Sequence, residues 1–206
     1  MNQAADDLLR VLRERRSVRQ FRGEPIPRAL VEQLIEAASW APSATNRQDW
    51  RFTVVTSATR KQEMADAVRR RWDAILAANR DCGFIEEIER YAASFARFAH
   101  APALVVVSAR APDSFQRHLL GEAAIATAGS ATSAAMAAQN LMLAAHALGL
   151  ATCCMTGVVA ARDELRPLIG LGRRDELVCI VALGYAAETP PPPPRKPIDE
   201  IARFIE

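Results

Sequence analysis

The sequence predicts an α+β fold, and three observations support this prediction. Of the 206 residues, 50% are hydrophobic and 24% are charged, which excludes a disordered or fibrous chain. Segments with apolar residues three and four positions apart alternate with short runs rich in β-branched residues. No linker divides the chain, so we expect residues 1–206 to form a single domain.

The first half of the chain is predicted to be mostly helical. Apolar periodicity predicts helices over residues 4–16, 58–79 and 84–98. A further amphipathic helix begins at Pro27, which suits a first helical turn, and ends before Pro42, because a residue preceding proline avoids helical angles. The β-branched run at 51–56 predicts the first strand.

The second half contains the other predicted strands, at residues 104–107, 151–155 and 176–183. Between the first two lies a predicted helix from about 122 to 148, which is roughly 40 Å long and ends at Gly149. A short helix is expected at 161–169. The five prolines 190–194 favour an extended segment, and apolar residues from Ile198 onwards predict a final helix.

The long central helix is predicted to be buried and to lie at a dimer interface. Residues 123–161 carry no charged side chain, which raises the alternative of a membrane span. Polar residues such as Gln139 and Asn140, and the weak hydrophobicity of alanine, argue against that alternative. Sixteen of the 40 alanines fall between residues 101 and 150, and so much small uncharged surface favours close helix contact across a homodimer.

The composition also limits the function. With 26 basic and 24 acidic residues, the net charge of +2 argues against a polybasic nucleic-acid module. The four cysteines form no C-x-x-C pair, so we expect reduced, buried and inert thiols and a cytoplasmic location. The three histidines are scattered, and no metal site is expected.

Four segments carry candidate ligand-binding residues. Arginines around Ser17 suit an anion such as phosphate, although a solvated helix end is the alternative reading of these residues. The polar loop 41–50 suits a ring with polar edges, and Thr156-Gly157 follows a strand where backbone N–H groups approach a ligand. Arg195-Lys196 follows the prolines. No catalytic triad or acidic pair accompanies them, which indicates that a cofactor performs the chemistry.

The chain resembles the FMN-dependent nitroreductase family in five motifs that occur in the order of the family. They are R-R-S-V-R at 15–19, A-P-S-A-T-N-R-Q-D-W at 41–50, A-P-A-L-V-V-V at 101–107, N-L-M-L-A-A-H-A-L-G-L at 140–150 and R-K-P at 195–197. The resemblance covers nearly the whole chain. It implies a central mixed, mainly antiparallel sheet flanked by helices, with two FMN sites at the interface of a homodimer.

The resemblance also implies roles for individual residues. The FMN phosphate and ribityl chain would be held by Arg15, Arg16 and Ser17. The flavin ring would be approached by Arg19, Thr156 and Gly157, with Arg97 as a further contact. A partner subunit would cover the flavin with Pro42, Ser43 and Asn46, and the phosphate would also be reached by Arg195 or Lys196.

The sequence departs from the family pattern in three places. Asp49 stands where the family usually has proline, Pro193 replaces one of two C-terminal basic residues, and residues 58–99 match weakly. The last segment varies with substrate in this family, so the sequence does not identify the acceptor.

The activity implied by the resemblance is hydride transfer from NADH or NADPH through FMN to a nitroaromatic, quinone or similar small molecule, in a ping-pong reaction. No side chain is expected to be catalytic, because the flavin carries the chemistry. Two alternatives stay open: another reaction of the same superfamily, namely flavin fragmentation or dehalogenation, and a non-catalytic anion- or nucleic-acid-binding module.

Overall fold

The computed structural model describes all residues except 1, 93–95, 115–116, 119–120 and 122–128. Its centre is a sheet with the order β1-β2-β4-β3, in which every neighbouring pair is antiparallel. The strands are β1 (Trp50–Val55), β2 (Ala103–Arg110), β3 (Ala151–Met155) and β4 (Asp175–Gly184). The four strands predicted from β-branched content are confirmed to within one to three residues at each end.

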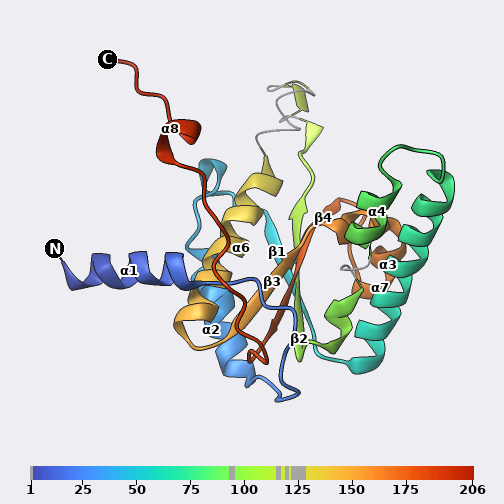
Figure 1. The fold of residues 1–206 in the computed structure, drawn as a ribbon, viewed down its shortest axis with the longest axis horizontal. Coiled ribbons are helices and arrows are strands. Elements are labelled where there is room, and N and C mark those ends of the chain that lie inside the picture. Colours follow the sequence, from blue (N-terminus) through green and yellow to red (C-terminus); the bar gives the residue numbers. More distant parts are fainter. Residues whose placement is uncertain (1, 93–95, 115–116, 119–120, 122–128) are drawn as a thin grey trace.

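Helices cover both faces of this sheet (Figure 1). One face packs against α3 (Ala58–Ala78) and α7 (Arg162–Ile169), and the other against α2 (Arg28–Ser39) and α6 (Ser130–Ala147). Side chains alternate along the buried central strands: Leu104 and Val106 face α3, whereas Val105 and Val107 face α6. Because both faces are covered, the central strands are continuous apolar runs.

Two of the predicted helices match described elements in part. The helix predicted from 122 begins at Ser130, because Gly129 precedes it in an extended conformation with φ −152°; residues 122–128 lie outside the described part. It ends at Ala147, and Gly149 adopts φ +77°, which glycine accommodates without strain. Of the helix predicted over 84–98, the structure describes α4 (Ile85–Ala92); residues 93–95 lie outside the described part, and a 3₁₀ turn, η2, covers Arg97–His100.

Both ends of the chain extend from this body (Figure 1). Helix α1 (Gln3–Glu14) has no buried residue, and Leu8, Leu9 and Leu12 on it are exposed. After the prolines, the arm carries a single helical turn, α8 (Ile198–Ile201), rather than the longer helix that its apolar residues suggested. No helix in the described residues is long and apolar enough to cross a membrane.

Candidate active site

The arginine-rich segment lies against one edge of the sheet. Ser17 forms a parallel bridge with Thr152 of β3, and the backbone N–H of Val18 donates to the Thr152 carbonyl at 3.0 Å. Farther along, Phe21 forms an antiparallel bridge with Ala186, just after β4. The strand edge therefore fixes the path of residues 17–21, which include part of the predicted anion-binding motif.

Glu188 holds the backbone beside Arg19. One carboxylate oxygen, Oε1, accepts the N–H of Arg19 at 2.6 Å and the N–H of Gln20 at 3.1 Å. Hydrogen bonds to a charged acceptor are stronger than neutral ones, so this contact fixes the direction of the segment. The side chain of Arg19 is exposed, and its guanidinium makes only a 3.5 Å contact with the Ser17 carbonyl.

A hollow opens beside the end of β3, and we call it the β3 pocket. Its walls come from three parts of the chain: the N-terminal segment, the end of β3 and the α4–η2 region. Their main side chains are Arg19 and Phe21, Cys154 and Thr156, and Tyr91 and Arg97. The structure thus brings together three of the predicted site residues, Arg19, Arg97 and Thr156.

A second hollow adjoins the start of the same segment, and we call it the arginine pocket. Arg15, Arg16, Glu188 and His146 contribute to its walls. Arg16 turns its guanidinium toward the carbonyls of Arg13 and Arg15, at 2.6 and 2.8 Å. No hydrogen bond or ion pair of the Arg15 guanidinium is formed within the described residues, which leaves this group available to an anion.

The turn after β3 is tied to helix α3. Thr156 precedes the 3₁₀ turn η3 (Gly157–Ala161), and the Gly157 carbonyl accepts the indole N–H of Trp72 at 3.2 Å. Arg71 donates to the Ala160 carbonyl at 3.1 Å. These two bonds fix the turn that carries Thr156 and Gly157 at the rim of the β3 pocket, although Gly157 itself is not part of its wall.

The η2 turn is held by a buried lysine. Lys61 of α3 donates to the carbonyls of Ala101 and Pro102, at 2.5 and 3.2 Å. Burial lowers the pKa of the Lys61 ammonium, because desolvation disfavours its charge. This anchor lies directly after η2 and so positions Arg97.

The cysteines differ from the expectation of inert buried thiols. Cys153 is buried, and burial raises its thiol pKa. Cys154, however, is exposed in the β3 pocket, and a hydrogen bond from Cys179 lowers its pKa. The pattern failed here because apolar neighbours in sequence do not show which strand residue lines a pocket.

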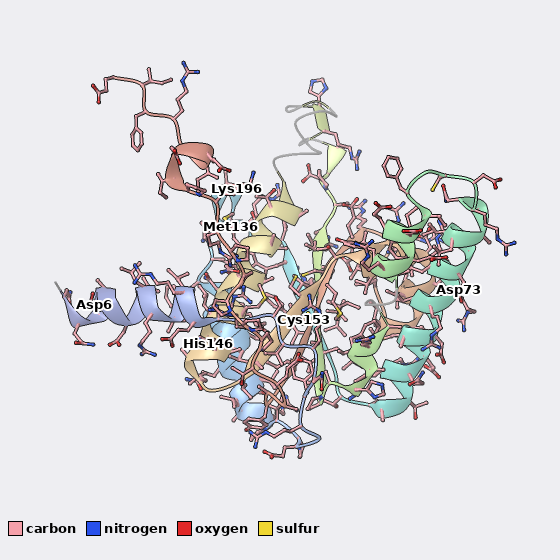
Figure 2. The ribbon with its side chains drawn as sticks, in the orientation of Figure 1. Asp6, Asp73, Met136, His146, Cys153 and Lys196 are labelled. Atoms are coloured by element: carbon pink, nitrogen blue, oxygen red, sulfur yellow. The ribbon has the colours of Figure 1, made fainter. Side chains whose placement is uncertain are left out.

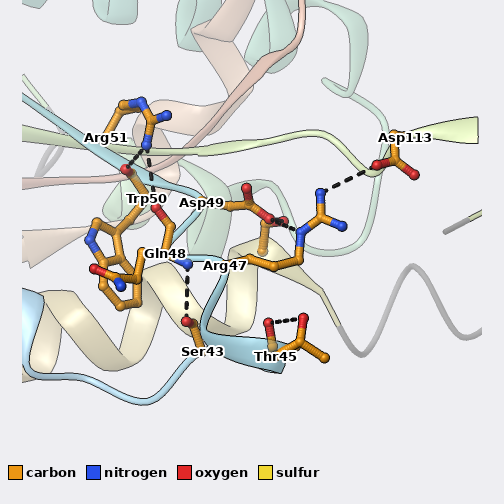
Figure 3. A network of polar contacts seen from close by, with 10 residues as sticks. Ser43, Thr45, Arg47, Gln48, Asp49, Trp50, Arg51 and Asp113 are labelled. Carbon is orange, nitrogen blue, oxygen red and sulfur yellow. Dashed lines mark hydrogen bonds and ion pairs between the residues drawn. The ribbon is translucent and has the colours of Figure 1, made fainter. Parts of the chain in front are cut away.

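The polar loop 41–50 is held by a network of charges (Figure 3). Arg47 pairs with Asp49 at 3.1 Å and with Asp113 at 3.3 Å, while Ser130 donates to Asp49 at 3.1 Å. The turn is strained, because three residues that are not glycine adopt positive φ: Thr45, Asn46 and Gln48. The network of charges holds the loop in this conformation. Asp49, the departure from the family pattern, therefore has a structural role in this loop.

Several predicted contacts are not part of either pocket within one chain. The loop residues Pro42, Ser43 and Asn46 contribute to neither wall. Figure 2 shows Lys196 on the C-terminal arm, well apart from Cys153 at the β3 pocket. Lys196 lies 4.0 Å from Glu200, and Arg195 donates to the Pro194 carbonyl, so neither reaches the arginine segment here.

Sequence reasoning missed Tyr91, Cys154 and Glu188 as site residues. No local motif marks them, since Glu188 meets Arg19 only through the pairing of distant segments. Among the described residues, no cluster of histidine, cysteine and acidic side chains is suited to hold a metal ion.

Comparison with known proteins identifies the family. The sequence model of the Nitroreductase family matches residues 12–185. The chain belongs to the nitroreductase family. It is 28% identical over 212 residues to an NADH dehydrogenase of Thermus thermophilus, covering 91% of each protein.

Two solved structures share the fold. A nitroreductase with bound FMN from Desulfitobacterium hafniense has a TM-score of 0.73 and 27% identity, with 100% of both chains covered. A BluB-like flavoprotein from Clostridium difficile has a TM-score of 0.84 and 25% identity, with 97% of this chain and 99% of the other covered. The predicted nitroreductase-like α+β fold is thus confirmed.

Proposed function

We propose that the protein is an FMN-dependent oxidoreductase that uses NADH or NADPH to reduce a nitroaromatic, quinone or similar small molecule. The observation that carries this proposal is that Arg19 and Thr156 line one pocket and Arg15 lines a second, with the neighbouring residues Val18 and Arg19 on the two walls. A flavin mononucleotide has the same two parts, a ring system and a phosphate. The FMN in the Desulfitobacterium relative supports the choice of cofactor.

The residues present fit FMN. Arg15, with Ser17 beside it, is suited to the phosphate, because guanidinium groups bind phosphate through paired hydrogen bonds. The aromatic and apolar parts of the β3 pocket suit a planar ring, and Gly157 allows its backbone close approach. Arg16 is turned toward backbone carbonyls, so its proposed share in phosphate binding requires the side chain to reorient.

The protein contributes position and charge to the reaction. FMN, when bound, supplies the transfer of an electron pair from the nicotinamide to the acceptor. Arg19 places a positive charge on the pocket wall, where it stabilises the negative charge that develops on reduction. Reduction of a nitro group to a nitroso group consumes one NAD(P)H and one proton and releases one water.

We also propose that the working protein is a homodimer. In a second copy, Pro42, Ser43 and Asn46 would cover the ring of the first, as the family resemblance implies. The exposed apolar side chains of α1 and of the C-terminal arm support this proposal, since they lack cover in one chain. The arm would carry Arg195 and Lys196 toward an arginine pocket across the interface.

The spectrum of the purified protein tests the cofactor. A yellow protein with flavin absorption that oxidises NADH or NADPH in the presence of a nitroaromatic supports the proposal. A colourless protein that binds DNA with steep salt dependence would support the anion-binding alternative instead. FMN-loaded protein that is active only on halogenated aromatics would place it with the dehalogenating alternative.

Substitution of Arg19 tests the role of its charge. Arg19→Ala should lower the flavin reduction potential and slow the oxidation of NADH roughly tenfold, because one stabilising charge is lost. Arg22→Ala is the matched control. This substitution removes a nearby positive charge, but Arg22 does not line the pocket. An unchanged potential and rate in Arg19→Ala would contradict the proposed role.

A further inference from the structure

One wall of the β3 pocket is not accounted for by the flavin. Arg19 and Thr156 belong to the segments that the family resemblance assigns to the ring. The remaining wall consists of Tyr91 from α4 and Arg97 from η2, with buried Phe98 behind them. Both Tyr91 and Arg97 lie within the stretch 58–99, where the sequence matches the family weakly. This wall is therefore where a second ligand of this particular protein would be selected.

The charge of this wall favours an anion. The pocket lining formed by the described residues includes two arginines and no carboxylate. Arg97 is exposed, and its guanidinium forms no hydrogen bond or ion pair within the described residues. The backbone directly after η2 is anchored, because Lys61 donates to the carbonyls of Ala101 and Pro102. With Arg19 committed to the flavin, Arg97 remains as a positioned cation for another partner.

The other component of the wall is aromatic. Tyr91 is 61% exposed, and its ring meets Trp72 edge-on with centroids 6.5 Å apart. Trp72 in turn donates to the Gly157 carbonyl at 3.2 Å. Tyr91 is thus tied, through one side chain, to the turn that we assign to the flavin ring. A large aromatic held at the mouth of a pocket provides a flat surface for a planar ligand.

We propose that this pocket selects aromatic acceptors that carry an anionic oxygen group, a carboxylate or a phenolate. Arg97 binds the anionic oxygens, and Tyr91 packs against the ring of the acceptor. This inference rests on the proposed function, and it reassigns Arg97 from the flavin to the acceptor.

Matched acceptors of equal shape test the charge. At saturating NADH, kcat/KM is measured for 4-nitrobenzoate and for 4-nitrobenzamide, which differ in charge but hardly in size. The wild type should prefer the carboxylate at least tenfold, as expected for one charge-assisted pair. Arg97→Gln should reduce this preference to about one, because the carboxylate loses its charged partner. The control Arg90→Gln removes a charge from the same region outside the pocket and should keep the preference.

A binding measurement separates recognition from turnover. Benzoate, which cannot be reduced, should perturb the absorption of the oxidised FMN-loaded protein and bind at least tenfold more tightly than benzamide. Arg97→Gln should abolish this difference. Tyr91→Leu should weaken both ligands alike, whereas Tyr91→Phe should retain their binding, because the ring and not the hydroxyl makes the contact.

The outcomes distinguish this inference from the proposed function. A protein that holds no FMN and oxidises no NAD(P)H overturns the function itself. An FMN-loaded protein that reduces 4-nitrobenzamide but shows no preference for the carboxylate overturns only the acceptor assignment. Loss of FMN from Arg97→Gln also overturns it, because Arg97 would then be a flavin contact.

Discussion

At the scale of single residues, Glu188 shows how one carboxylate organises a binding segment. It accepts two consecutive backbone N–H groups, those of Arg19 and Gln20, from a position 169 and 168 residues away. The contact lies between the two pockets, since Arg19 lines one and Glu188 lines the other. The geometry of the proposed flavin site therefore depends on a residue that does not itself touch the ring pocket.

Removal of this carboxylate should weaken FMN binding. We expect Glu188→Ala to raise the dissociation constant of FMN roughly tenfold or more, because two charge-assisted hydrogen bonds are lost. Glu188→Gln keeps an acceptor oxygen and should have a smaller effect. Titration of the FMN-free protein, followed by quenching of flavin fluorescence, measures both. Glu24→Ala, which breaks an exposed ion pair with Arg22, is the control and should leave the affinity unchanged.

His146 should make stability depend on pH. It lies at the end of α6, near the base of α1 (Figure 2), and burial lowers its pKa below the usual 6.5. Glu14 opposes this shift, whereas Arg15, Arg10 and Arg16 add to it. Because the unfolded chain then binds the proton more readily, folding stability falls as the pH drops below about 6.5 and through the lower folded pKa.

The variant His146→Gln tests this dependence. Between pH 7.5 and 5.5, the wild type should lose more stability than the variant, by less than about 1 kcal/mol, since the ring is only half-buried. Thermal unfolding of the FMN-free proteins at several pH values measures the difference. Parallel pH profiles of the two proteins would show that His146 does not contribute.

At the scale of elements, the end of β4 requires glycine because other elements approach it closely. A Cβ atom on Gly184 would lie 2.6 Å from Cδ of Pro102 and 2.9 Å from Cδ1 of Phe21. Pro102 precedes β2, and Phe21 lines the β3 pocket. The glycine thus allows a connector, a strand and a pocket wall to meet at one point.

Gly184→Ala should therefore destabilise the fold. We expect a loss of about 1–3 kcal/mol and a decrease in Tm of roughly 2–10 °C, because the proline ring and the strand backbone have little room to move. Gly23→Ala is the matched control, since a Cβ there meets nothing within 4 Å. Equal Tm values for the two variants would exclude the steric explanation.

At the scale of the whole molecule, the exposed apolar side chains require an explanation. On the arm, Ile201, Phe204 and Ile205 are 63%, 81% and 86% exposed, and the leucines of α1 are exposed as well. A second copy would cover both elements, which is the homodimer proposed above.

We expect the wild type to sediment as a dimer. The dimer of the double variant Phe204→Ser/Ile205→Ser should dissociate at a higher protein concentration than the wild-type dimer, because apolar contact area is removed. The variant should also hold less FMN, because the proposed site is built by two copies. Arg203→Ala, on the same arm, is the control. A wild-type monomer that still binds FMN tightly would contradict the dimer.

Local sequence patterns predicted much of this structure. Leu104 to Val107 were recognised as a strand because β-branched runs are typical of buried strands, and the bounds of α2 follow from Pro27 and Pro42. The grouping of Arg19 with Thr156 was predicted from family resemblance, and the structure places both on one pocket. The start of α6 at Ser130 was not predicted, because apolar periodicity does not register where a chain changes direction.

The sequence by itself determined the types of element, the apolar faces that form the core and the family. The tertiary structure decided which distant side chains meet: Glu188 with Arg19, Trp72 with Gly157, and Tyr91 with Arg97 around one pocket. The physical reason is that secondary structure depends on interactions between residues a few positions apart. Contacts between residues distant in sequence depend instead on strand pairing and helix packing. Only that pairing brings β3, the chain after β4 and the N-terminal segment to a common edge.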